Sequence, residues 1–115
     1  MADIIAAIST AAAPAAIGIV RLSGPGCARV AGRVFTPARG GALEELPEKR
    51  LCLGTLRDSR GRVIDRCMAV LSRAPHTYTG EDTVELHCHG SPAVLAAALE
   101  ALFAAGARQA LPGEF

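Results

Sequence analysis

The chain has few aromatic residues and no cluster of positive charge. Its 115 residues include no tryptophan, one tyrosine and three phenylalanines, and 12 basic against 11 acidic residues leave a net charge of +1. RNA-binding domains stack bases on aromatic side chains and neutralise phosphates with lysine and arginine. Because the arginines of this sequence are scattered between acids, it shows no electrostatic footprint of an RNA-binding surface.

Several motifs that bind phosphates or carry nucleophiles are also missing. The sequence contains no GxxxxGK[ST], GxGxxG or GxSxG motif, and its one lysine, Lys49, lies in a stretch rich in Glu and Pro. We therefore expect no GTP hydrolysis by this chain alone.

Nothing in the sequence is typical of a secreted or membrane protein. The cysteines are Cys27, Cys52, Cys67 and Cys88. They are too widely spaced for a CxxC motif, and the first residues lack the basic region of a signal peptide. We expect reduced, mostly buried thiols and a cytoplasmic location. The apolar stretch 4–20 is interrupted by Ser9, Thr10 and Pro14, which favours two strands and a loop over a membrane anchor.

What is present is an alternation of β-branched runs with two alanine-rich stretches. Strands are predicted over residues 4–9, 17–22, 51–57, 63–72, 82–89 and 107–111, and helices over about 25–35 and 93–105. Residues 36–49, rich in Pro, Gly and Glu, are expected to form a solvated connection. The order predicts one α+β domain over residues 1–115, with a mixed sheet packed against two helices.

Both predicted helices have start signals. Ser23, Gly24 and Pro25 precede the first, and Ser91 and Pro92 precede the second. The second helix is apolar nearly all round, so we expect it to be buried on more than one side.

Strand 82–89 separates an apolar face from a polar one. With a period of two, Thr83, Glu85, His87 and His89 share one side, opposite Val84, Leu86 and Cys88. The polar side is either a solvated sheet face or a binding surface. A metal site is a third interpretation, but it requires His76 to join His87 and His89.

Arg21 is the second candidate site residue. It occupies a strand whose neighbours, Ile19, Val20 and Leu22, suggest burial on both faces. A buried guanidinium needs an anionic or hydrogen-bonding partner. We expect either a salt bridge, to Glu85 or Asp65, or a contact to a ligand.

Four segments and a CHG triplet together resemble one protein family. They are DIIAAIST (3–10), GIVRLSG (18–24), YTGEDTVEL (78–86), CHG (88–90) and PGEF (112–115). In this order and spacing they are similar to the amino-terminal domain of the MnmE/TrmE tRNA-modification GTPases. The sequence departs from the family's Gly-rich loop at residues 10–16, and it has His87 where the family often has Gln.

The resemblance implies a fold, a ligand and partners. The fold would resemble half of the folate-binding domain of the glycine-cleavage T-protein, with a homodimer supplying the second half. The ligand would be a one-carbon donor, 5-formyl- or 5,10-methylene-tetrahydrofolate, contacted by Arg21 and Glu85. The partners would be an MnmG-type flavoprotein and tRNA, reached through a helical domain and a G domain that we expect to be absent from this chain.

Two other functions stay open at this stage. One is an assembly module that dimerises but has lost folate binding, because the altered 10–16 loop changes any backbone approach to a ligand. The other is a small metal-dependent enzyme that uses His76, His87 and His89.

Overall fold

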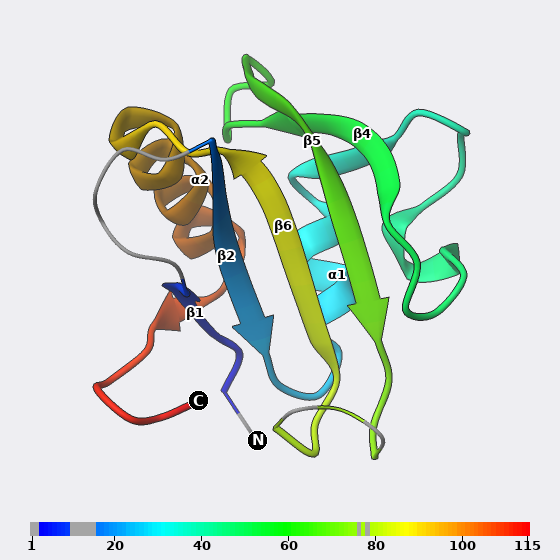
Figure 1. Ribbon diagram of the computed structural model, residues 1–115, viewed down its shortest axis with the longest axis vertical. Coiled ribbons are helices and arrows are strands. Elements are labelled where there is room, and N and C mark those ends of the chain that lie inside the picture. The colour runs from blue at the N-terminus through cyan, green and yellow to red at the C-terminus, as the bar shows by residue number, and fades with distance from the viewer. Residues whose placement is uncertain (1–2, 10–15, 76, 78) are drawn as a thin grey trace.

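Seven strands form one mixed sheet, and both α-helices pack against the same face of it (Figure 1). The computed structural model describes residues 3–9, 16–75, 77 and 79–115. The strands are β1 (Ile5–Ile8), β2 (Ile17–Ser23), β3 (Phe35–Pro37), β4 (Cys52–Arg57), β5 (Val63–Ser72), β6 (Thr83–His89) and β7 (Arg108–Gln109). The helices are α1 (Cys27–Gly32) and α2 (Pro92–Ala105), with a short 3-10 helix, η1 (Leu43–Glu45). The predicted α+β class is confirmed.

The strand order across the sheet is β3-β4-β5-β6-β2-β1-β7. All neighbours are antiparallel except β1 and β7, which run parallel. The central neighbours β2 and β6 are thus far apart in the sequence, and they bring residues 17–23 beside residues 83–89.

The core lies between the sheet and the two helices. Alternate residues of the central strands face it and are at most 3% exposed: Val20, Leu22, Cys67, Ala69, Leu71, Val84, Leu86 and Cys88. From the helices, Cys27, Val30, Ala31, Leu95, Ala98, Ala101 and Leu102 pack against them. The period-two alternation predicted for strand 82–89 is therefore confirmed.

The first helix is shorter than predicted, and a strand follows it. α1 ends at Gly32, and Phe35 begins β3 instead of extending the helical stripe. Phe35 is 1% exposed because its ring lies over Gly54 of β4, where a Cβ atom would stand only 2.3 Å from Cζ. The predicted start signal at Ser23 was also wrong. Ser23 ends β2, and the residue that precedes α1 is Gly26 at φ 74°.

The 36–49 connection was predicted from its composition to be solvated, but it is partly buried. It contains the end of β3 and the 3-10 helix η1, and Leu43 and Leu46 are buried at 0% and 3% exposure. The Glu45 side chain accepts a hydrogen bond from the Ala42 backbone N–H at 2.8 Å, which closes the turn that carries these leucines into the core.

The second helix follows its predicted boundaries but not its predicted burial. The Ser91 hydroxyl accepts a hydrogen bond from the Val94 N–H at 3.4 Å, and Gly106 caps the other end. Only one side of α2 is buried, since Ala96, Glu100 and Ala104 on the other side are exposed. Within the described residues, no helix combines the length and apolar character needed to cross a membrane.

Candidate functional site

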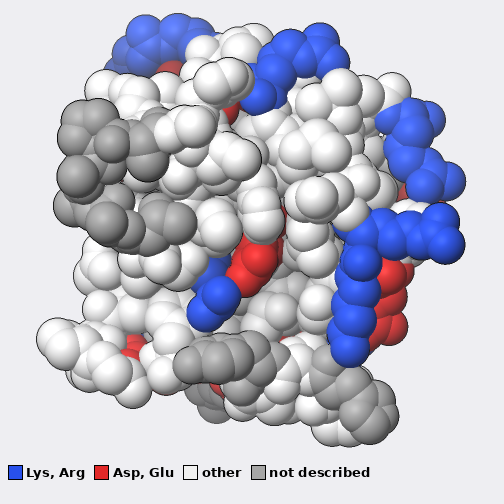
Figure 2. Space-filling view, in the orientation of Figure 1, with Lys and Arg blue, Asp and Glu red and all other residues white. Residues whose placement is uncertain are grey.

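Among the described residues, no helix covers the sheet face opposite α1 and α2, here called the open face, and its central strands carry a charged pair. Figure 2 looks onto this face and shows acidic and basic side chains meeting in a hollow among uncharged residues. The strand register places Glu85 of β6 directly across from Arg21 of β2, with Val70 of β5 and Ala7 of β1 next in the same row.

Arg21 and Glu85 form a close ion pair. The Arg21 Nη2 and Nε atoms lie 2.6 Å and 2.9 Å from Glu85 Oε2, and the two side chains are 24% and 26% exposed. The expected salt bridge is thus present, with Glu85 rather than Asp65 as the partner. The prediction that this strand is buried on both faces was wrong, because Ile17, on the same face as Arg21, is 58% exposed.

His87 completes a three-residue network around the carboxylate. Its Nε2 atom lies 3.0 Å from Glu85 Oε1, and its side chain is 23% exposed. Burial raises the pKa of Glu85, but the hydrogen bonds from His87 and Arg21 outweigh this, so the pKa lies below its usual range. Glu85 is therefore an ionised, half-buried acceptor held from two sides.

The two histidines of β6 contact different carboxylates. His89 Nδ1 lies 2.7 Å from Asp65 Oδ1, and the His89 backbone N–H donates to Asp65 Oδ2 at 2.9 Å. In the part of the chain described, no three His, Cys, Asp or Glu residues are grouped to hold a metal ion. The third ligand of the metal interpretation, His76, lies outside the described residues.

A shallow recess adjoins the network on the same face. Its volume is about 220 Å³, and its lining is mainly apolar: Ala16, Ile17, Leu53, Arg66, Cys67, Met68, His87, Cys88 and His89. Leu53 is 45% exposed, so the recess opens onto an apolar surface. An open sheet face with an anchored carboxylate beside an apolar recess suits a planar ligand that carries hydrogen-bond donors on one edge.

Comparison with known proteins identifies the chain. The profile of the family described as "GTP-binding protein TrmE N-terminus" matches residues 4–115. The chain belongs to this family.

Curated relatives agree over the whole chain. The tRNA modification GTPase MnmE of Synechococcus sp. (strain JA-3-3Ab) is 50% identical over 117 residues, covering 100% of this chain and 25% of the relative. The proteins of the same name from Chloroflexus aurantiacus and Thermus thermophilus are 46% and 47% identical, covering 100% and 98% of this chain and 25% and 26% of their own lengths. The chain thus spans about a quarter of these relatives.

The motifs that resemble the TrmE amino-terminal family lie together in the fold. Ser23, at the end of GIVRLSG, shares a 2.8 Å hydrogen bond between its Oγ atom and Thr79 Oγ1. The Gly24 N–H donates to the Asp82 carbonyl at 3.0 Å. The TGED segment is therefore fastened to the end of β2, next to the Arg21–Glu85 pair. Tyr78 and residues 10–15 of the Ala/Pro loop lie outside the described residues.

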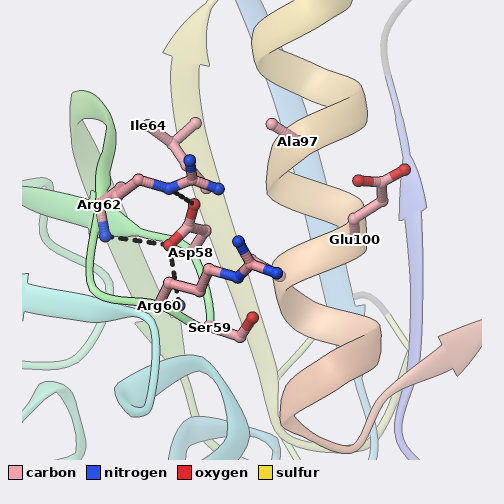
Figure 3. A pocket seen from close by; sticks show the side chains of 8 residues that line it. Asp58, Ser59, Arg60, Arg62, Ile64, Ala97 and Glu100 are labelled. Atoms are coloured by element: carbon pink, nitrogen blue, oxygen red, sulfur yellow. Dashed lines mark hydrogen bonds and ion pairs between the residues drawn. The ribbon is translucent and has the colours of Figure 1, made fainter.

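Another cavity among the described residues of this TrmE-type fold lies away from the open face. It measures about 440 Å³ and separates the β4–β5 turn from α2 (Figure 3). Two of its charged side chains pair with each other: Asp58 lies 3.1 Å from Arg62, and it also accepts the backbone N–H groups of Arg60 and Arg62 at 2.9 Å. Glu100 of α2 points away from these arginines (Figure 3). The hairpin was predicted from the sequence, but no local sequence pattern indicated this cavity.

Proposed function

We propose that this chain is the folate-binding and dimerisation domain of a tRNA-modifying GTPase, with residues 1–115 forming that one domain. The observation that carries the proposal is the half-buried carboxylate of Glu85, ionised and centred on the open face. Membership of the TrmE amino-terminal family supports it, because the resemblance implies folate contacts at Glu85 and Arg21.

The chemistry of the two side chains suits a reduced folate. The pterin ring of a tetrahydrofolate presents an amino group and a ring N–H side by side, and a carboxylate accepts such a pair of donors. Arg21 orients Glu85 and lies beside it, where a guanidinium can contact an oxygen of the ligand. The ligand is a one-carbon donor, 5-formyl- or 5,10-methylene-tetrahydrofolate, and it supplies the transferred carbon. The residues of this chain bind and orient it.

Homodimer formation is supported by the apolar surfaces that a single chain leaves exposed. The open face exposes Ile17 and Leu53, and the outer side of α2 consists mainly of alanine. A second copy that packs on either of these two opposite surfaces removes apolar area from water. In the proposed arrangement the two copies correspond to the two halves of the T-protein folate-binding domain.

The remaining partners belong to the longer protein. The relatives are named tRNA modification GTPases, and this chain spans about a quarter of them. We assign GTP hydrolysis to a separate G domain, joined through a helical domain. We expect tRNA and an MnmG-type flavoprotein to bind the complete cytoplasmic protein.

Direct titration tests the proposal. Isothermal calorimetry with 5-formyltetrahydrofolate is expected to give saturable binding with one ligand site per chain. A chain that dimerises but gives no saturable heat is an assembly module only, and that result contradicts the folate assignment.

A further inference from the structure

Three kinds of side chain follow one another along β5 and its neighbours on the open face. Glu85, the ionised acceptor, lies directly across from Val70 of β5. Two residues along β5, Met68 lies across from Leu53 of β4, and two residues further comes Arg66. Steps of two residues along a strand keep to one face of a sheet, and directly opposed residues share that face. An anion, an apolar band and a cation therefore lie in this order.

Arg66 is a cation with no partner at the edge of the recess. Its side chain is exposed, and among the described residues its guanidinium makes no hydrogen bond or ion pair. The recess that it lines has no carboxylate among its described lining residues. Its sequence neighbour Asp65 does not compete, because Asp65 is engaged by His89 at 2.7 Å. A guanidinium keeps its charge at all relevant pH values, so this end of the open face suits an anion.

We propose that Arg66 binds the carboxylates of the glutamate tail of the folate, while the aminobenzoyl ring of the ligand lies in the recess between Arg66 and Glu85. This inference rests on the proposed function. The aminobenzoyl ring is flat and largely apolar, and the recess has a mainly apolar lining that includes Leu53 and Met68 and a volume of about 220 Å³. The glutamate carries two carboxylates, and a guanidinium donates to a carboxylate through parallel hydrogen bonds.

The spacing of the two ends agrees with this orientation. Val70, the neighbour of Glu85, and Arg66 are four residues apart on one strand, so the two rows lie about 13 Å apart at a rise of about 3.3 Å per residue. A pterin held at Glu85 and turned along the strand places its linked ring over the middle row. The tail then reaches the row of Arg66, where Thr55 lies directly across and carries a hydroxyl donor.

The test compares two ligands that differ only in the tail. Calorimetry is carried out with 5-formyltetrahydrofolate and with 5-formyltetrahydropteroate, which lacks the glutamate. At low ionic strength the wild-type chain is expected to bind the folate about threefold to tenfold more tightly, between the effect of an exposed ion pair and that of a hydrogen bond to a charged group. This preference should shrink at high salt, because the ions screen the exposed Arg66.

Two variants assign the preference to Arg66. Arg66→Gln is expected to bind the two ligands equally and to keep the wild-type affinity for the pteroate. The ratio of the two affinities within one variant is independent of any loss of folded protein, which lowers both binding signals alike. Arg62→Gln is the matched control, because it removes the same charge from a side chain that is 72% exposed and pairs with Asp58 away from the open face. It should keep the wild-type preference.

The two ligands also separate the possible failures. Equal affinities of the wild-type chain for both ligands, or an unchanged preference in Arg66→Gln, overturn the role of Arg66 while pteroate binding still supports the anchor at Glu85. No binding of either ligand by the wild-type chain overturns the proposed function and this inference with it.

Discussion

Glu85 of β6 and Arg21 of β2 are direct cross-strand neighbours, and Arg21 Nη2 lies 2.6 Å from Glu85 Oε2. The two residues are 64 positions apart in the sequence. Their contact joins the GIVRLSG and TGEDTVEL segments at the centre of the open face. It links the sheet topology to the proposed ligand site, because both side chains depend on the β2–β6 pairing for their positions.

The ionised state of Glu85 predicts a pH dependence of stability. A carboxyl whose pKa is lower in the folded state stabilises the fold above its unfolded pKa, about 4.5, and loses that contribution as the pH falls through the folded value. Glu85→Gln is therefore expected to flatten part of the fall in unfolding free energy below about pH 4.5. Urea titrations at several pH values measure this. Glu100→Gln, on the exposed side of α2, is the control and should follow the wild type; identical slopes for all three proteins contradict the prediction.

Gly54 is expected to be essential for the packing of β3. A Cβ atom there would lie 2.3 Å from Phe35 Cζ and 2.5 Å from the Thr36 carbonyl oxygen. Gly54→Ala should cost about 1–3 kcal/mol in unfolding free energy, as overpacking does. Gly32→Ala is the matched control, since its Cβ would meet nothing closer than 3.8 Å and Gly32 lies in a helix. It should be neutral or stabilising; equal losses in urea unfolding would show that the close approach at Gly54 is unimportant.

Local sequence signals predicted the elements whose causes are local. The alternation over residues 83–89, the Ser91 cap and Gly106 stop of α2, and the hairpin around Asp58 all lie in the structure where they were expected. β3 was not predicted because it depends on a contact between residues distant in the sequence. Gly54, 19 positions from Phe35, leaves room for the Phe35 ring beside β4.

The residues of the candidate site could be predicted from the sequence, but the hydrogen bonds between them could not. Arg21 and Glu85 were singled out, and their salt bridge was one of the open alternatives. The shared face of Glu85 and His87 follows from strand parity, yet the hydrogen bond between them depends on rotamers and on how Arg21 occupies the other oxygen. The recess beside His87 is built by four strands and the residue before β2, so no single segment indicated it.

Homodimerisation is a separate prediction. The exposed Ile17 and Leu53 side chains of the open face are expected to be covered by a second copy. Sedimentation velocity at micromolar concentration should show a dimer. Leu53→Glu, which brings a charge to the open face, should shift the population toward monomer, whereas Val63→Glu at the start of β5 should not. A stable wild-type monomer contradicts the dimer.

GTP hydrolysis is expected to be at background level for this chain alone. The sequence has no phosphate loop, and Lys49, its only lysine, lies outside any glycine-rich turn that precedes a helix. Phosphate release from GTP and Mg²⁺ by the purified chain measures this directly. Turnover that co-purifies with the chain through several columns would show that the prediction is wrong.

The central claim is that Glu85 anchors a reduced folate on the open face of the sheet, and Glu85→Gln tests it most directly. The substitution keeps the size of the side chain but exchanges an acceptor for a donor, so one of the two donors on the pterin edge meets another donor. We expect the affinity for 5-formyltetrahydrofolate to fall by about 1–3 kcal/mol, roughly tenfold to a hundredfold, in calorimetry at neutral pH. Glu100→Gln, on α2, should bind as the wild type does. Equal affinities of wild type and Glu85→Gln would contradict the account.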